Sequence, residues 1–227
     1  MRSRTPHHFL SLSAFGYRLN WNFVDAALLL SFFLSGSCAL VYQIAWQRLL
    51  YGIIGIDSDS VTIVVSVFML GIGLGGAIGG WLSDAAPRWR LPIYVIIEIS
   101  IAAYGAISFW GLQTLDGWIL QQGATQTRAL SAFASFLVLC IPTVLMGMTL
   151  PLLTLALNER RSNIGVAVGT LYFVNTLGAA TGAMLVPFVL LPMMRLDQII
   201  WAAVTGNLVV ATCAFKALRT ISRQERP

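Results

Sequence analysis

Charged side chains are scarce in this sequence. They make up 10% of its 227 residues, whereas a typical soluble domain carries about 25%. Apolar residues make up 57%, and the mean hydropathy is +0.79. Apolar stretches take up most of the length and leave no room for a folded aqueous domain. The composition therefore excludes an ordinary soluble protein and predicts an integral membrane protein.

Patterns of catalytic or metal-binding residues are also missing. The two histidines, His7 and His8, stand side by side without further ligands at a suitable spacing, and the three cysteines lie singly inside apolar stretches. The sequence contains no H-E-x-x-H pattern and no nucleophile with an adjacent base. We therefore predict no metal, no cofactor and no enzymatic activity.

One glycine-rich pattern imitates a nucleotide site. Residues 71–76 satisfy G-x-G-x-x-G, but they lie inside an apolar stretch and no strand precedes them. The net charge of +5 would suit nucleic acid, yet the basic residues occur singly or in pairs at the ends of apolar stretches. We expect the glycines that repeat here at every fourth residue to pack helices together, namely Gly71, Gly75 and Gly79, and also Gly76 and Gly80. We expect no nucleic-acid partner.

Six segments are long enough to cross a hydrocarbon core about 30 Å thick, which needs roughly 20 apolar residues. They predict an all-α membrane domain over residues 23–219, flanked by basic tails at 1–22 and 220–227. The expected spans are 24–50, 60–82, 91–112, 130–157, 164–191 and 197–218. Residues 113–128 are expected to form an interfacial helix followed by a hinge.

The basic residues predict the orientation. An even number of spans puts both termini on one side, and that side then holds eleven of the 14 Lys and Arg residues, against Arg48, Arg128 and Arg195 on the other. By the positive-inside rule the richer side is cytoplasmic. We expect a bacterial inner-membrane protein with both termini in the cytoplasm.

Small residues recur at helical spacing in the second and fifth spans. A glycine-rich helix is thus second in each set of three, which predicts a 3+3 inverted repeat like one half of a major facilitator transporter. Prolines 142, 151, 187 and 192 predict breaks in the fourth and fifth spans. The glycines expected to allow close helix contact are Gly71, Gly75, Gly79, Gly165, Gly169, Gly178 and Gly182.

The turn after the second span resembles the major facilitator signature Gly-x-Leu-x-Asp-basic-x-Gly-basic-basic. Ala85 and Pro87 depart from that pattern. The resemblance implies a gating loop, and the alternative is a capped turn with an Asp–Arg pair. The matching candidates for the gating loop are Gly80, Asp84, Arg88 and Arg90, together with Leu82.

A closer resemblance covers almost the whole chain. The segments LSGSCALVYQIAWQRLL, IEISIAAYGA, IPTVLMGMTLPLL and GTLYFVNTLGAATGAMLVPFVLLP resemble the membrane part of the fused major-facilitator/spermidine-synthase family. In that family a helical bundle precedes a soluble aminopropyltransferase-like domain. The chain ends at Pro227, so we expect that domain to be absent here and a separately encoded aminopropyltransferase-like protein to be a possible partner.

Polar residues at membrane depth usually face protein or water, because their insertion into lipid is costly. Glu98 is the main case. It either carries a proton or cation in a polar cavity or serves as an interhelical hydrogen-bonding group, and Asn207 is expected to do the latter. The candidates for lining that cavity are Glu98, Gln43, Gln47, Tyr172 and Asn175. The alternative for these residues is again interhelical hydrogen bonding, which we favour for Gln43 and Asn175.

Three hypotheses for function follow. The first is a half-size, transporter-like bundle that works as a homo-oligomer or with another membrane protein. The second is a non-catalytic membrane subunit that anchors or organises a larger complex. A membrane enzyme is the third and weakest, because the sequence shows no catalytic pattern.

Overall fold

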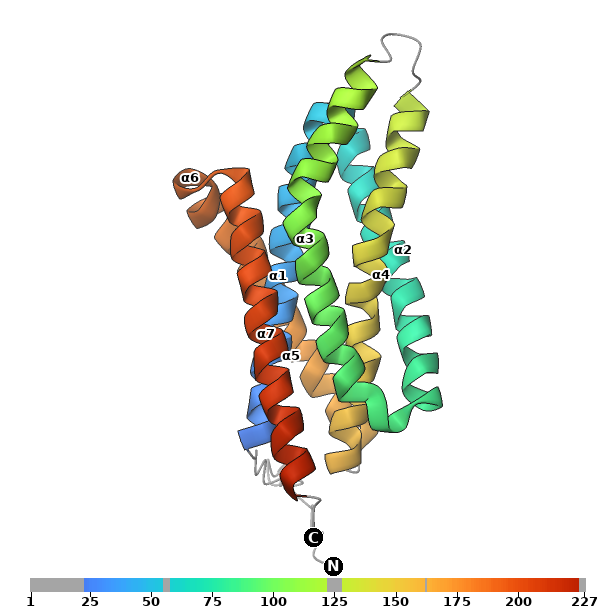
Figure 1. Cartoon of the computed structure of the whole chain (residues 1–227), viewed down its shortest axis with the longest axis vertical. Coiled ribbons are helices and arrows are strands. Elements are labelled where there is room, and N and C mark those ends of the chain that lie inside the picture. The colour runs from blue at the N-terminus through green and yellow to red at the C-terminus, as the bar shows by residue number, and fades with distance from the viewer. Residues whose placement is uncertain (1–22, 55–57, 122–127, 162, 225–227) are drawn as a thin grey trace, which may run out of the picture.

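The computed structural model describes residues 23–54, 58–121, 128–161 and 163–224. These residues form a bundle of long helices (Figure 1). The helices are α1 Phe23–Ile54, α2 Ser58–Ala85, α3 Arg90–Gln121, α4 Arg128–Arg161, α5 Ile164–Leu185, α6 Leu191–Met193 and α7 Leu196–Gln224. A 3-10 turn at Pro87–Trp89 precedes α3, and a π-helix at Val186–Leu190 joins α5 to α6.

Within the described ranges, six helices are long and apolar enough to cross a membrane. Their number and order confirm the prediction of a six-helix bundle. In lipid every backbone N–H and C=O must be paired inside the chain, and a continuous helix achieves this within a single segment. The last helix reaches Gln224, beyond the membrane-domain boundary expected at residue 219. The expected tail at 1–22 lies outside the described residues.

The third helix differs from the prediction. Residues 113–121, expected to begin a separate interfacial helix, instead continue α3 without a break. This stretch has no proline, and its single glycine, Gly117, does not interrupt the hydrogen-bonded turns. The helical conformation predicted for this stretch is confirmed, but its separation from the third span is wrong, because a change from apolar to mixed composition does not by itself end a helix. The expected hinge falls on residues 122–127, which lie outside the described residues.

The prolines have two different outcomes. The fourth helix continues through both Pro142 and Pro151, so the predicted break is wrong there. Pro142 has no N–H to donate to the carbonyl of Val138, four residues earlier. The Tyr104 hydroxyl of α3 donates to that carbonyl at 2.5 Å. At Pro187 the helix widens to the π form and stays helical.

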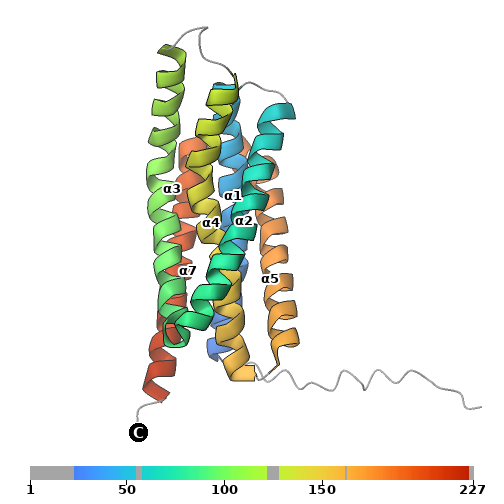
Figure 2. The same ribbon diagram turned by 90° about the vertical axis from the view of Figure 1, so that its right-hand side faces the viewer.

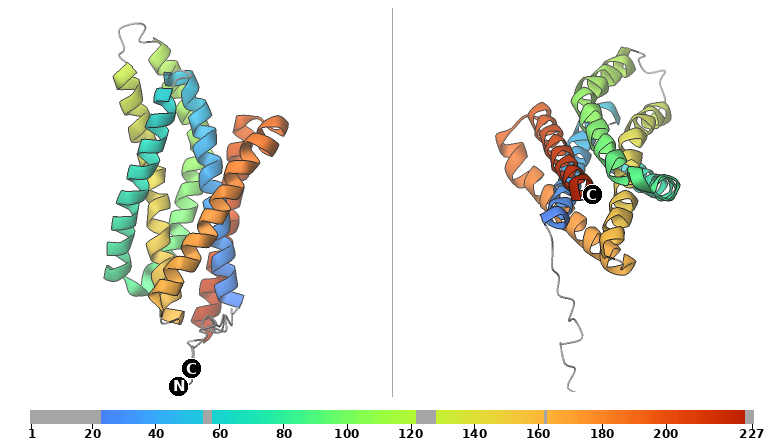
Figure 3. Two further views of the ribbon diagram at one scale, coloured as in Figure 1. Left: turned by 180° about the vertical axis from the view of Figure 1, so that it is seen from behind. Right: turned by 60° about the horizontal axis from the view of Figure 1, so that its bottom comes forward.

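Helix pairing defines the architecture. The closest pairs are α2 with α4 and α1 with α5, while α7 packs against both α1 and α3. Seen from behind, α2 and α4 lie on one side and α5 with α6 on the other, with α1 between them (Figure 3). A quarter turn shows α5 on the side opposite α3 and α7 (Figure 2). The start of α1 and the end of α7 lie at the same end of the bundle (Figure 1).

Glycines account for the close approach of the two tightest pairs. A Cβ on Gly79 would lie 2.7 Å from Cα of Met148 in α4, and one on Gly71 or Gly75 would also overlap α4. In α5, a Cβ on Gly178 or Gly182 would overlap the backbone of α1. The other two glycines predicted to pack differ. Gly169 has nothing within 4 Å of a Cβ, and the nearest atom to one on Gly165 is the Asn163 side chain at 3.6 Å.

Candidate functional site

The polar centre of the bundle is Glu98, a fully buried residue of α3. The Ser35 hydroxyl of α1 donates to one carboxyl oxygen at 2.7 Å. The Asn207 side-chain amide of α7 lies 2.6 Å from the other oxygen. A single side chain thus joins three helices that are far apart in sequence.

Tyr94 completes this group, which we call the Glu98 cluster: Ser35, Tyr94, Glu98 and Asn207. Tyr94 lies one turn before Glu98 on α3 and is also fully buried. Its hydroxyl is close enough to interact with the carboxyl, although it makes no hydrogen bond of good geometry. The Asn207 carbonyl oxygen is likewise buried without a hydrogen-bond partner. The cluster therefore has hydrogen-bonding capacity that its own atoms leave unused.

Small residues let the three helices close around the cluster. Gly105 of α3 lies against the Tyr42 ring of α1, and a Cβ added to Gly105 would be 2.7 Å from carbon atoms of that ring. Gly206 of α7 lies against the Cys38 sulfur of α1 in the same way. Tyr42 is fully buried and Cys38 is 8% exposed. The cluster is consequently enclosed by protein and does not line an open channel.

The other residues predicted to line a polar cavity lie elsewhere. Tyr172 is 62% exposed on α5. Asn175 packs against Gly36 of α1, and Gln47 donates to the Tyr51 hydroxyl at 2.8 Å. Gln43 is half-buried on α1. Among the described residues, the hydrogen bonds to Glu98 come from Ser35 and Asn207, so the structure does not bring the predicted set together.

Sequence reasoning missed Ser35 as a partner of Glu98. The available signal was a neutral hydrogen-bond donor in the first apolar span, at a depth comparable with that of Glu98. Asn207 was predicted to form an interhelical hydrogen bond, and it does so with Glu98. Whether Ser35 and Asn207 reach Glu98 depends on how their helices are rotated about their axes. The sequence of a single helix does not determine that rotation.

The turn that resembles the major facilitator signature divides into open and packed residues. Gly80 has open space around it, and Asp84 and Arg88 are exposed. Within the described part of the chain, Asp84 makes no ion pair. Arg90 is buried, where its Nε donates to the Ser83 carbonyl at 2.9 Å and its guanidinium pairs with Glu159 of α4. The expected Asp–Arg pair of a capped turn is thus replaced by an Arg–Glu pair between helices.

A second ion pair lies at the same end of the bundle. Arg160 of α4 pairs with Asp25 of α1 at 2.8 Å, and the Asp25 side chain is only 2% exposed. Its neighbour Glu159 pairs with Arg90 of α3. We call these four residues the ionic clasp. Two consecutive residues of α4 therefore connect it to two different helices.

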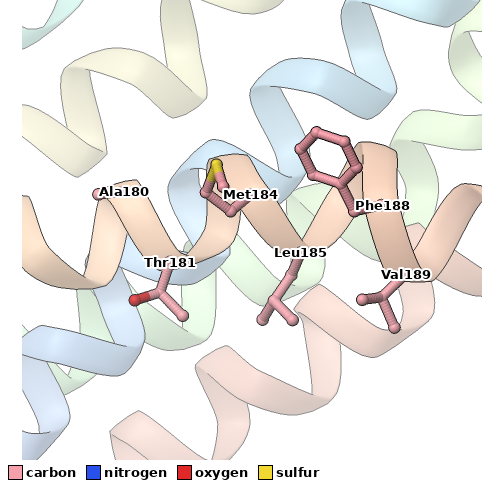
Figure 4. A pocket seen from close by; sticks show the side chains of 6 residues that line it. All are labelled: Ala180, Thr181, Met184, Leu185, Phe188 and Val189. Carbon is pink, nitrogen blue, oxygen red and sulfur yellow. The ribbon is translucent and has the colours of Figure 1, made fainter.

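A hollow of about 550 Å³ lies on the outer side of α5 (Figure 4). Its side chains are mainly apolar and come from one helical stretch, so it is a surface feature and is separate from the Glu98 cluster. The residues that line it are Ala180, Thr181, Met184, Leu185, Phe188 and Val189. Among the described residues, no group of three or more His, Cys, Asp or Glu side chains could hold a metal ion.

These features define a class: a polytopic helical membrane protein with one enclosed carboxyl at its centre. The chain is homologous to polyamine aminopropyltransferases. It is 30% identical to polyamine aminopropyltransferase 2 of Streptomyces coelicolor over 202 residues, 86% of this chain and 35% of the relative. It is 29% identical to polyamine aminopropyltransferase 1 of the same organism over 73% of this chain and 29% of that relative.

A third relative, polyamine aminopropyltransferase 2 of Ralstonia nicotianae, is 24% identical over 76% of this chain and 32% of its own length. The chain thus spans about a third of the length of these curated relatives. The similarity fits a family related to spermidine synthases. No protein-family model matches the chain, and no solved structure matches it.

The relatives correct one prediction. We expected no enzymatic role, because the sequence holds no recognisable catalytic pattern. Four proteins that match most of this chain are named polyamine aminopropyltransferases, and these names point to an enzyme. The prediction failed because it searched this chain alone for catalytic residues. The chain matches only about a third of the length of these relatives, and such a search cannot detect residues in the rest of them.

Proposed function

We propose that this chain is the membrane-spanning part of a polyamine aminopropyltransferase. The observation that carries the proposal is the similarity to such enzymes over 86% of this chain. The helical bundle and an aminopropyl-transferring unit then act together at the bilayer, whether that unit belongs to the same polypeptide or to a partner. A bundle in this position can deliver or remove the polyamine cations that the unit acts on.

The bundle itself is proposed to be a half-size, transporter-like unit with a 3+3 inverted repeat. The contact pattern supports this. A 3+3 repeat would relate α1, α2 and α3 to α4, α5 and α7, in that order. Under this correspondence the pair α1–α5 is equivalent to α4–α2, and the pair α1–α7 is equivalent to α4–α3. All four pairs are in contact, and both α1–α5 and α4–α2 rely on glycine. A full transporter needs two such halves, so the unit would act as a homo-oligomer or with a second membrane protein.

The proposed location is a bacterial inner membrane with both termini in the cytoplasm. The basic residues support this orientation, since the positive-inside rule assigns the face rich in Lys and Arg to the cytoplasm. Reporter fusions after residue 57, within 113–128 and after Pro227 should read outside, outside and inside. An outside reading after Pro227 would contradict the even number of crossings.

Aminopropyl transfer tests the enzymatic part of the proposal. The tagged full chain, purified gently from its native membrane and supplied with an aminopropyl donor, should transfer the aminopropyl group to a labelled diamine with release of the donor's leaving group. Gly75→Leu should lower that activity, because the side chain would separate α2 from α4. Gly73→Leu is the matched control on the same helix, since nothing lies within 4 Å of a Cβ there. A wild-type preparation without transfer activity would contradict the proposal.

Flux measurements test the transport part. Liposomes containing the purified full chain should accumulate labelled polyamine faster than empty liposomes. Transfer activity without any flux would favour the alternative, in which the bundle anchors the catalytic unit at the membrane. That outcome would remove the comparison with half of a transporter and leave the aminopropyltransferase assignment intact.

A further inference from the structure

Among the described residues, the side chains that interact with the Glu98 carboxyl are neutral. From α1 it faces Ser35, with Cys38 and Tyr42 close by, from α3 it faces Tyr94, and from α7 it faces Asn207. None of these side chains is a cation.

The cationic side chains that the structure describes on these three helices lie away from the cluster. Arg90 is held in the ionic clasp at one end of the bundle, and Arg48, Lys216 and Arg219 are exposed. A buried carboxylate without a cationic partner is strongly disfavoured, whereas a protonated carboxyl needs no counter-ion.

The contact with Asn207 can serve a protonated carboxyl as well as an ionised one. The side-chain amide lies 2.6 Å from one Glu98 oxygen, and the amide's own oxygen is buried without a hydrogen-bond partner. The oxygen and nitrogen of a side-chain amide exchange places on a half-turn. After that half-turn, the Asn207 oxygen, which otherwise has no partner, would accept the proton of Glu98.

We propose that Glu98, Ser35, Tyr94 and Asn207 form an enclosed proton-binding site in the seam between α1, α3 and α7. In the loaded state Glu98 donates its proton to the Asn207 oxygen, and the Ser35 hydroxyl donates to the second carboxyl oxygen. In the unloaded state the amide turns its NH₂ towards the carboxylate, and the Tyr94 hydroxyl supplies a third donor. An amide at this position is matched to both states because it carries a donor and an acceptor.

Release of the proton requires water, and the closed seam admits none to a residue that is fully buried. The proton therefore leaves to solvent only when α1, α3 and α7 separate, so the seam opens more readily as the pH rises. This property belongs to the bundle alone. It holds whether or not the chain is part of an aminopropyltransferase, and its tests require no transfer activity.

Infrared spectroscopy of the full chain in lipid nanodiscs tests the loaded state. At pH 7 the wild type should show the C=O stretching band of a protonated carboxyl, and Glu98→Gln should lose that band. Asn207→Leu should move the band to higher frequency, because the acceptor of the proton is removed. Glu159→Gln, at an exposed carboxyl, is the matched control and should leave it unchanged. A wild type without the band, or a band that survives Glu98→Gln, would overturn the assignment.

Thiol labelling tests the coupling between proton release and opening. Cys38 is 8% exposed and packs against Gly206, next to Asn207, so it reports on the seam. The reaction is measured with Cys140 and Cys213 replaced, and the ratio of wild-type to Glu98→Gln rates cancels the titration of the thiol itself. That ratio should rise with pH by up to about tenfold per pH unit, since opening releases one proton. A ratio that is constant with pH would refute the coupling.

Discussion

Two kinds of helix contact in this bundle differ in what they can do. The glycine seams, α2 with α4 and α1 with α5, bring backbones together where a Cβ would overlap the facing helix. The polar seam, between α1, α3 and α7, closes around a buried carboxyl and its hydrogen-bond donors. Glycine contacts depend on shape alone, so the pH does not affect them, whereas a carboxyl seam can respond to a proton.

The rigid contact and the pH-responsive contact lie on different sides of α1. One side of this helix contacts α5 through Gly178 and Gly182 of the partner helix. Another side contributes Ser35 to the Glu98 cluster. The first helix is therefore fixed to α5 while it takes part in a contact that can open, which is the arrangement expected of a helix that moves as a unit with its partner.

The largest expected effect comes from breaking a glycine seam. Gly75→Leu places a side chain against the Val144 carbonyl and against Gly147 of α4, whose Cα would be 2.8 Å from the new Cβ. Backbone atoms cannot move aside as a side chain can, so the helices must separate. We expect a loss of about 1–3 kcal/mol in unfolding free energy, measured by thermal unfolding in detergent.

Gly73→Leu is the control for that change, because the same helix has open space at this position. It should leave the unfolding temperature nearly unchanged. Equal destabilisation by both variants would mean that leucine harms α2 in general, and the distinction between packed and open glycines would fail.

A single methyl group tests the second glycine seam. Gly178→Ala brings a Cβ against the Phe33 carbonyl of α1, whereas Gly169→Ala meets nothing within 4 Å. We expect the first variant to lose about 1 kcal/mol, near the lower limit for overpacking, and the second to lose nothing measurable. The measurement is again thermal unfolding. A neutral Gly178→Ala would show that α5 can move away from α1, so α5 would not belong to the rigid part of the bundle.

The sequence alone predicted the helices better than their contacts. Hydropathy located the six spans, and the spacing of Gly71, Gly75 and Gly79 placed these residues on one face. Gly165 and Gly169 have the same spacing and lie open. Periodicity states which residues share a face, but it does not state which face another helix covers.

The Glu98 cluster shows a second limit. Glu98 was recognisable as a buried acid in an apolar span, yet its partners are 63 and 109 positions away in the chain. Pro142 illustrates the same point, because the carbonyl that it leaves without an N–H partner accepts a hydrogen bond from Tyr104 of another helix. Effects that depend on helix rotation and on neighbouring helices cannot be read from one segment.

In the polar seam, one hydrogen bond contributes less than a glycine contact. Ser35→Ala removes the 2.7 Å bond to Glu98 and should cost about 0.6 kcal/mol, the typical value for such bonds between membrane helices. Ser100→Ala is the control, since Ser100 bonds to the Ile96 carbonyl of its own helix. A loss well above that of Gly75→Leu would reverse the comparison and make the polar seam the principal stabilising contact.

The smallest effect is expected from the ionic clasp. Glu159→Gln removes the charge that faces Arg90 but leaves the bond from Arg90 to the Ser83 carbonyl in place. The Glu159 side chain is 57% exposed, so water and salt already screen the pair. We expect a loss of at most about 0.5 kcal/mol, and this difference from the wild type should vanish in high salt. A larger loss that persists in high salt would show that charge at the helix ends also holds the bundle together, and the division into glycine and polar seams would then need the clasp as a third element.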